Sequence, residues 1–418
     1  MRGFNTLLFV LFALSANAAD ETVGTVSVQK GNNVSVNGEA PLSLTLDGKD
    51  PQNCQFLSKR VADESHDFTW KEVTTTRGGE LAEMLGDQLR SIDSLVVKGN
   101  VNDKDFHAMW DASLYGYLSV INLKNAVLEN NAVPDTAFFH ENEQYEGSSH
   151  EIFYYIGLRK IILPEGLEKI GEGAFYQASA LRQVNFPSTL RYIGDFAFNA
   201  TKLEMNQLVI PEGVEEINQY AFAFCRKLKA QVTLPSTIKK IGEWAFYGCP
   251  ITSINLPEGL ESLGSLAFWD CDLREVSIPS SCHEFNEGWQ FGFNRNLEKM
   301  HLPEGMTEIP DHFAVDCFRL REVNFPHTLK HIGEKAFSLC ISLKNVELPL
   351  GMQSLGEEAF SELEALEQIV FPASMKSLGK NSCSYWKNIK RIYCAAMEPP
   401  VCDPTDGGVF SGFDFPDG

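Results

Sequence analysis

The sequence is poor in basic residues and contains no run of them. Its 418 residues include 35 lysines and arginines against 56 aspartates and glutamates, a formal net charge of −21 at pH 7. Because DNA, RNA and anionic lipids are bound through clustered Lys and Arg, this balance argues against nucleic-acid and membrane-surface partners. The acidity is explained by solubility, with a weak affinity for calcium as the lesser alternative.

Long apolar runs are also missing, with one short exception at the start. Leu7–Leu14 (LLFVLFAL) follow Met1-Arg2, and Ala16-Asn17-Ala18 fits the rule for signal cleavage. The stretch is shorter than the roughly 18 residues that a membrane span needs. We therefore expect a signal peptide at 1–18 and an exported chain, secreted or at the cell surface, without a membrane span. No cysteine lies beside the cleavage site, which argues against a bacterial lipoprotein anchor.

The motifs of common enzymes are absent. The sequence has no G-x-S-x-G, H-E-x-x-H, P-loop, G-x-G-x-x-G or C-x-x-C. Nothing distinguishes one carboxylate pair for glycoside hydrolysis. His301, His312, His327 and His331 form the densest histidine group, but scattered surface residues explain them better than a site does. Residues 403–407 (DPTDG) faintly resemble a calcium loop, although a plain turn is favoured. We expect no catalysis, no cofactor and no metal.

A repeat of 22 to 24 residues dominates the rest of the chain. In each copy an apolar triplet precedes a proline, as Leu181, Val184 and Phe186 precede Pro187. Further apolar residues follow at three and six positions after the proline, then a frequent glycine, and in seven copies a phenylalanine at position eleven. The marker prolines are Pro164, Pro187, Pro211, Pro235, Pro257, Pro279, Pro303, Pro326, Pro349 and Pro372.

The triplet is the L-x-x-L-x-L strand of a leucine-rich repeat. Since one coil cannot bury its own apolar residues, stacked coils must cover one another. The predicted fold is an α/β-type repeat solenoid, a right-handed coil with a continuous parallel β-sheet on one face. Counting from Val97 to Cys394 gives 13 coils, which at about 4.8 Å per strand span about 60 Å.

The spacing also divides the chain into segments. Residues 19–78 alternate like strands around turn dipeptides and predict a small β-rich leader. Residues 79–394 form the solenoid, where 79–92 show helical spacing suited to an N-terminal cap. Residues 141–155 are expected to be an insertion loop, and 395–418 a C-terminal cap or tail.

The unit LPEGLEKIGEGAF, with its ten marker prolines, resembles the BspA-type leucine-rich repeat of host-associated bacteria. The resemblance covers roughly residues 92–394. It implies an exported or surface-exposed protein and a role in adhesion to host matrix proteins, plasma proteins or other cells. Two features depart from the pattern: no lipid-anchor cysteine and no recognisable sorting domain are present.

Five of the ten cysteines lie fourteen residues after their marker proline: Cys225, Cys249, Cys271, Cys317 and Cys340. A shared repeat position favours buried thiols, with disulfides between stacked coils as the alternative. Cys282 and Cys394 occupy core positions of other coils, Cys54 has no evident partner, and a Cys394–Cys402 bond is the remaining option.

The candidate binding site is the solvent-facing side of the predicted strands, which we expect to be concave. A solvated sheet face is the alternative interpretation. Aromatic anchors are sparse there apart from Tyr393, and Trp244, Trp269 and Trp289 lie on the other side of their coils. The candidate residues are Gln183, Asn185, Gln231, Thr233, Ser253, Asn255, Glu275, Ser277, Lys299, His301, Glu322, Asn324, Asn345 and Glu347.

These observations predict an exported leucine-rich-repeat protein that mediates protein–protein or cell-surface binding. The expected partner is an extracellular protein or cell-surface component of host or bacterial origin, with a glycan as another option. A structural spacer or envelope scaffold, or a glycan-binding module, is the alternative function.

Overall fold

The computed structural model describes residues 26–29, 33–36, 68–139, 156–402 and 408–412. The chain divides into two units, Met1–Phe68 with Ile152–Tyr155, and Thr69–Glu151 with Ile156–Gly418. In the first unit, β1 (Val26–Gln29) and β2 (Asn33–Val36) form an antiparallel pair. The expected signal peptide, the insertion at 141–155 and Cys54 lie outside the described residues.

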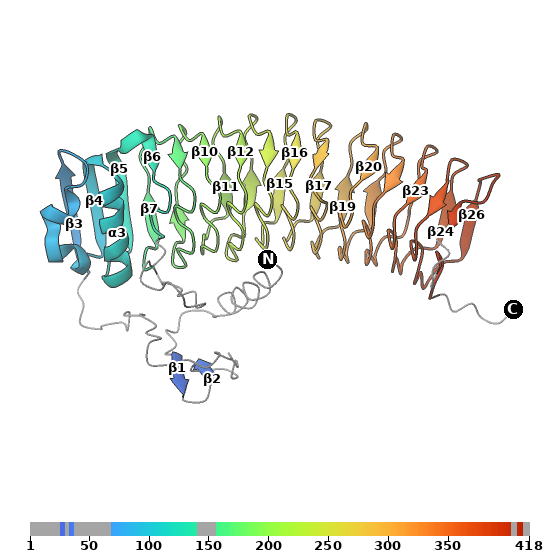
Figure 1. Ribbon diagram of the computed structural model, residues 1–418, viewed down its shortest axis with the longest axis horizontal. Coiled ribbons are helices and arrows are strands. Elements are labelled where there is room, and N and C mark those ends of the chain that lie inside the picture. The colour runs from blue at the N-terminus through green and yellow to red at the C-terminus, as the bar shows by residue number, and fades with distance from the viewer. Residues whose placement is uncertain (1–25, 30–32, 37–67, 140–155, 403–407, 413–418) are drawn as a thin grey trace, which may run out of the picture. The chain divides into compact units, whose positions relative to one another are not determined.

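The second unit is a parallel β-solenoid of about 13 turns, which confirms the leucine-rich-repeat prediction (Figure 1). One strand from nearly every coil lies along the same side, and we call these strands the primary sheet. Hydrogen bonds join them in four groups, β3-β4-β5-β7-β9, β11-β13-β15, β17-β19-β21 and β24-β26. The strands are β3 (Trp70–Thr75), β4 (Ser94–Val101), β5 (Val120–Leu128), β7 (Lys160–Ile162), β9 (Gln183–Val184), β11 (Gln207–Val209), β13 (Gln231–Thr233), β15 (Ser253–Asn255), β17 (Glu275–Ser277), β19 (Lys299–His301), β21 (Glu322–Asn324), β24 (Gln368–Phe371) and β26 (Arg391–Cys394).

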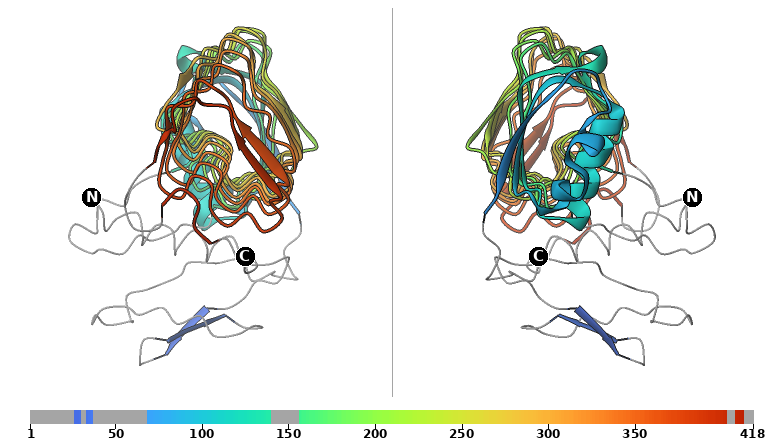
Figure 2. Two further views of the ribbon diagram at one scale, coloured as in Figure 1. Left: turned by 90° about the vertical axis from the view of Figure 1, so that its right-hand side faces the viewer. Right: turned by 90° about the vertical axis from the view of Figure 1, so that its left-hand side faces the viewer.

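A second parallel sheet, which the repeat pattern did not predict, forms another side of the coils (Figure 2). Its short strands hold the apolar residue six positions after each proline, so that Ile170, Ile193 and Ile217 stack in register. Strands of two residues are too short for an alternation to show in the sequence. They are β6 (Ala132–Val133), β8 (Lys169–Ile170), β10 (Tyr192–Ile193), β12 (Glu216–Ile217), β14 (Lys240–Ile241), β16 (Ser262–Leu263), β18 (Glu284–Phe285), β20 (Glu308–Ile309), β22 (His331–Ile332), β23 (Ser354–Leu355), β25 (Ser377–Leu378) and β27 (Val401–Cys402).

The core contains a column of buried phenylalanines, one from each successive coil. Phe222 and Phe246 are fully buried, their ring centroids are 5.3 Å apart and their planes differ by 3°. Such aromatic pairs add about 0.5–1.5 kcal/mol each beyond the burial of their area. The column includes the seven phenylalanines expected at position eleven, and Phe291 and Phe313 fill the coils where the spacing shifts.

The N-terminal end of the solenoid is closed by helices. The expected helical segment at 79–92 forms α2 (Leu81–Leu85) and the 3-10 helix η2 (Gly86–Ser91). A longer helix, α3 (Asp103–Tyr115), follows β4 and packs at the same end. It begins at a capping box, in which the side chain of Asn102 accepts a hydrogen bond from the backbone N–H of Asp105 and the side chain of Asp105 accepts one from the backbone N–H of Asn102. A further 3-10 turn, η3 (Glu129–Asn131), follows β5.

The primary sheet begins earlier than the pattern indicated. Strand β3 pairs in parallel with β4 from Trp70↔Ser94 to Thr75↔Gly99. These residues fall within 19–78, the segment assigned to the leader. Only Val73 and Thr75 of β3 are buried, so the strand carries a weak apolar signal.

The C-terminal end is covered in part. Residues 408–412 run beside the last coil, where the N–H of Cys383 donates to the carbonyl of Val409 at 3.1 Å and Val409 is buried. All four residues of β26 are exposed. Within the described part of the chain, no helix has the length and apolar content to cross a bilayer.

Candidate binding surface

The outward face of the primary sheet is set by alternation along very short strands. In β13 and β15 the middle residues Val232 and Ile254 are buried, while the residues on either side are exposed. Successive side chains on a strand point to opposite faces. Every coil therefore presents two outward positions, four and two residues before its marker proline. We call these the outer face of the primary sheet.

The structure brings ten of the fourteen predicted residues together in two hydrogen-bonded blocks, while Gln183, Asn185, Asn345 and Glu347 lie on other coils. In the first, Gln231 pairs with Ser253 and Thr233 with Asn255. In the second, Glu275, Lys299 and Glu322 align on three strands, and a parallel row holds Ser277, His301 and Asn324. Twelve of the fourteen candidates are exposed, and Lys299 and His301 are half-buried.

Two candidates use their side-chain amide groups for hydrogen bonds to the backbone of the preceding coil. The Oδ1 of Asn185 accepts from the N–H of Leu163 at 2.7 Å, and its Nδ2 donates to the Leu163 carbonyl at 3.0 Å. Asn324 makes the same pair of bonds with Leu302, both at 2.9 Å. These side chains extend the ladder between coils where the strands are short. We therefore assign Asn185 and Asn324 a structural role.

The centre of the outer face carries a compact group of charges. The Nζ of Lys299 lies 3.0 Å from a carboxylate oxygen of Glu322, and the Nε2 of His301 lies 3.2 Å from one of Glu275. The hydrogen bond from Lys299 lowers the pKa of Glu322. Since the two pairs are exposed, they orient side chains more than they stabilise the fold.

The outer face is nearly neutral although the protein is strongly acidic. Among the two outward positions before each of the ten marker prolines, Lys160 and Lys299 oppose Glu275, Glu322 and Glu347, a net charge of −1 against −21 for the chain. The other positions carry mostly amides, hydroxyls and a few aliphatic groups. Such a surface suits hydrogen bonding to a partner without strong charge.

Outward residues that the sequence prediction missed include Gln207, Val209 and Val370, whereas Tyr393 was expected on this face. Gln207 and Val209 lie on β11 in register with Gln231 and Thr233. Val370, half exposed at 49%, and Tyr393, at 52%, lie side by side on β24 and β26. Counting back four and two residues from Pro211 and Pro372 would have found Gln207, Val209 and Val370.

The four histidines that cluster in the sequence do not converge. His301 contacts Glu275, and His327 contacts Glu304 at 3.0 Å. His312 stacks on Trp289 with 3.6 Å between ring centroids, while His331 bonds to Ser354. No three His, Cys, Asp or Glu side chains of the described residues are gathered as metal ligands.

The cysteines at position fourteen are buried and free. Their thiols donate to carbonyl oxygens of the preceding coil, as Cys249 does to Phe222 at 2.9 Å. Cys394 and Cys402 are both exposed and both free, so the bond considered between them is not formed in the structure. The loop at 403–407 lies outside the described residues.

Trp244, Trp269 and Trp289 follow the short strands of the second sheet and lie away from the outer face. Trp244 stacks on Tyr220 with centroids 5.2 Å apart, and Trp269 packs at 4.5 Å from Phe293. Each of these rings contacts an aromatic ring of a neighbouring coil, so these residues serve packing between coils.

Comparison with known proteins identifies the repeat. A family model described as BspA type leucine rich repeat region matches in six copies, over residues 148–232, 229–330 and 312–397. No curated protein matches the chain.

Solved structures of bacterial leucine-rich-repeat proteins are among those to which this chain is similar. A leucine-rich repeat protein from Bacteroides ovatus aligns over 90% of this chain and 94% of its own, with 20% identity and a TM-score of 0.53. A leucine rich cell surface protein from Faecalibacterium prausnitzii aligns over 91% of this chain and 96% of its own, with 16% identity and a TM-score of 0.38. Because the family model matches well over half of the sequence, the chain belongs to the BspA-type leucine-rich-repeat family.

Proposed function

We propose that this protein is an exported, non-catalytic binding protein that engages an extracellular protein or cell-surface component through the outer face of its primary sheet. The observation that carries the proposal is the near-neutral, amide-rich character of that face on a chain with a net charge of −21. A surface kept low in charge can approach a partner without large desolvation cost.

A polypeptide partner is favoured over a glycan by the composition of the face. Amide and hydroxyl groups such as Gln231, Ser253 and Asn255 form hydrogen bonds with backbone N–H and C=O groups. Aromatic side chains, which are common in binding hot spots, are restricted here to Tyr393 among the outward residues of the described strands from β7 to β26. Export is supported by the N-terminal apolar stretch and by family membership.

The test is capture from a mixture of extracellular-matrix and serum proteins with residues 19–418 as bait. The variant Gln231→Lys with Asn255→Lys places two charges on the outer face. The control variant Thr307→Lys with Ala373→Lys adds the same charge at exposed positions outside it. We expect the first variant, but not the control, to capture at least one protein about tenfold less, or weaker still, than the unmodified bait does.

Equal loss in both variants would show that capture depends on net charge and not on the outer face. No capture by the unmodified bait would contradict the proposal and support a spacer role. Both outcomes are read after circular dichroism has shown that each variant is folded.

A further inference from the structure

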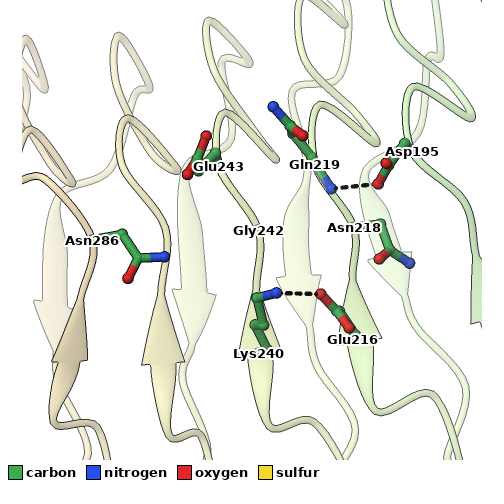
Figure 3. Close-up of a pocket in the computed structure, with 8 residues that line it drawn as sticks. All are labelled: Asp195, Glu216, Asn218, Gln219, Lys240, Gly242, Glu243 and Asn286. Carbon is green, nitrogen blue, oxygen red and sulfur yellow. Dashed lines mark hydrogen bonds and ion pairs between the residues drawn. The ribbon is translucent and has the colours of Figure 1, made fainter.

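Neighbouring coils in the middle of the solenoid supply partners for one another. On the second sheet, the Nζ of Lys240 lies 2.8 Å from a carboxylate oxygen of Glu216, and the N–H of Gln219 donates to Asp195 at 3.1 Å (Figure 3). Each of these pairs joins two successive coils. The last described coil, formed by β26, β27 and residues 408–412, has such a neighbour on one side only.

The apolar core is uncovered at this end, where β26 is the last strand of the primary sheet (Figure 1). Ile392 and Cys394 of β26 lie in register with Ile369 and Phe371 of β24. Ile369 is 1% exposed and Phe371 is 2% exposed, whereas Ile392 is 39% exposed and Cys394 is also exposed. The positions of Ile392 and Cys394 therefore belong to the core, but no further coil of the described residues covers them.

The backbone of β26 is unpaired along one edge. The N–H of Ala395 donates to the carbonyl of Phe371 on the side of β24, at 2.9 Å. Because the backbone groups of successive residues point to opposite edges of a strand, those of Ile392 and Cys394 point away from β24. No described strand pairs with this free edge. A free edge of this kind is a template for another strand.

The charge of this end favours a second copy of the chain as its partner. In β26, β27 and residues 408–412, Arg391 is the only charged residue, although the chain carries 56 acidic side chains. Two strongly acidic chains approach most easily where acidic groups are absent. The N-terminal end of a second copy offers no matching core, because Leu81 and Leu85 are 0% and 5% exposed there. The matching surface is therefore the same C-terminal end.

We propose that the chain forms a two-fold symmetric dimer, in which β26 pairs antiparallel with β26 of a second copy. Centred on Tyr393, this pairing places Ile392 opposite Cys394 of the second copy, so that a large inward side chain meets a small one. The free backbone groups of these two residues then exchange hydrogen bonds. Arg391 lies opposite Ala395 of the second copy, so no like charges meet across the contact. Because each end is used by the other, the assembly closes at two copies.

The dimer joins the two outer faces. The two-fold axis of an antiparallel strand pair runs perpendicular to the sheet, so both copies keep their outward side chains on the same side. The outer faces then form one continuous surface through Tyr393. A partner with repeated epitopes would bind both copies at once and gain in overall affinity. The dimer itself depends only on the end of the solenoid and not on the function proposed for the outer face.

Sedimentation velocity of the full chain in reductant, over a wide range of protein concentration, measures the dimer. The test variants are Cys394→Pro, which removes a free-edge N–H, and Ile392→Glu, which places a charge at the uncovered core position. Their matched controls are Cys394→Ser, which keeps the N–H, and Leu350→Glu, which adds the same charge at a side chain 88% exposed on another coil. Each test variant should raise the dissociation constant by about tenfold or more, and each control by less than about twofold.

A cross-linking experiment tests the register without weakening the contact. In a background with Cys54, Cys394 and Cys402 changed to serine, Tyr393→Cys places two thiols opposite each other at a non-hydrogen-bonded pair, where Cα atoms are about 4.5 Å apart. This separation suits a disulfide, so oxidation with diamide should give a covalent dimer. The control is Val370→Cys on β24, whose two copies lie three strand spacings, about 14 Å, apart and should not cross-link.

A chain that sediments as a monomer at every concentration would overturn the proposal. Equal effects of a test variant and its control, or equal cross-linking of Tyr393→Cys and Val370→Cys, would do the same. Assemblies larger than a dimer would show an open, head-to-tail contact instead of a closed one. The outer-face variant with Gln231→Lys and Asn255→Lys should still form the dimer, so this proposal and the proposed function fail separately. Circular dichroism first shows that each variant is folded.

Discussion

At the scale of single residues, the buried cysteines act as hydrogen-bond donors between coils. Cys225 donates to Phe198 at 3.2 Å, and Cys317 donates to Phe291 at 3.3 Å. Asn294 and Trp386 make the corresponding bond through nitrogen, to carbonyls of the coils before them. The position therefore requires a buried group that carries a hydrogen to the preceding coil, and a thiol meets this need without a large desolvation cost.

The buried thiols should react more slowly than the exposed ones. Burial raises the pKa of Cys282 to about 12 and that of Cys383 to about 12, and it raises the pKa of Cys249 and Cys340 well above the ordinary value. A raised pKa keeps the thiol protonated at pH 8, and the thiolate is the reactive form. In a Cys54→Ser background, Ellman's reagent should therefore modify Cys394 and Cys402 quickly and the seven buried thiols only after unfolding.

The control is the same reaction in guanidinium without reductant. All nine thiols of the described residues should then react. A smaller number would show that disulfides link some of the stacked coils.

At the scale of elements, the second sheet depends on the absence of side chains at the repeat glycine. Besides the close approach at Gly264, a Cβ at Gly194 would lie 2.6 Å from the nitrogen of Glu172, and one at Gly356 would lie 2.6 Å from the nitrogen of Glu334. These neighbours are backbone atoms, which cannot rotate away. In the coils that carry this glycine, it therefore sets the spacing on this side.

Gly264→Ala should destabilise the protein by about 1–3 kcal/mol, because the added methyl group pushes two coils apart. The matched control is Gly351→Ala, where the nearest atom to the new Cβ is the carbonyl oxygen of His327 at 3.8 Å. That change should alter the free energy of unfolding by no more than about 0.5 kcal/mol. Urea unfolding measured by circular dichroism compares the two, and equal effects would show that the close approach is relieved at no cost.

At the scale of the whole solenoid unit, each coil is bonded mainly to its two neighbours. Such a stack is stabilised by interfaces between adjacent repeats, and the ends open more easily than the middle. Asp105 stabilises the N-terminal end. Its side chain is 1% exposed, and its carboxylate accepts hydrogen bonds from the backbone N–H groups of Gly79 at 2.7 Å and Leu81 at 2.9 Å. The exposed strand β26 at the other end has no comparable cover among the described residues.

Asp105→Ala should open the N-terminal end and leave the middle intact. It removes the acceptor of buried backbone donors, each worth about 1–3 kcal/mol when left unsatisfied. Hydrogen exchange followed by mass spectrometry should become faster in β3, β4 and β5 and stay unchanged in β17, β19 and β21. Uniform acceleration along the chain would show that the unit unfolds as a single cooperative block.

The regular spacing of the prolines was enough to predict the solenoid, the buried phenylalanine column and the outward positions of the primary sheet. These features follow from local alternation and from the need of each coil to bury its apolar residues against the next. The helix α3 was missed although its capping residues Asn102 and Asp105 are visible in the sequence, because its surroundings were interpreted as another coil.

Other features arise only when coils are placed side by side. The second sheet, the thiol bonds and the use of Asn185 and Asn324 as ladder extensions all join residues more than twenty positions apart. The sequence by itself thus determined the repeating coil and its inward residues, because these depend on periodicity within one chain segment. Tertiary structure alone decided which polar groups remain unpaired, because that depends on the distances between stacked coils.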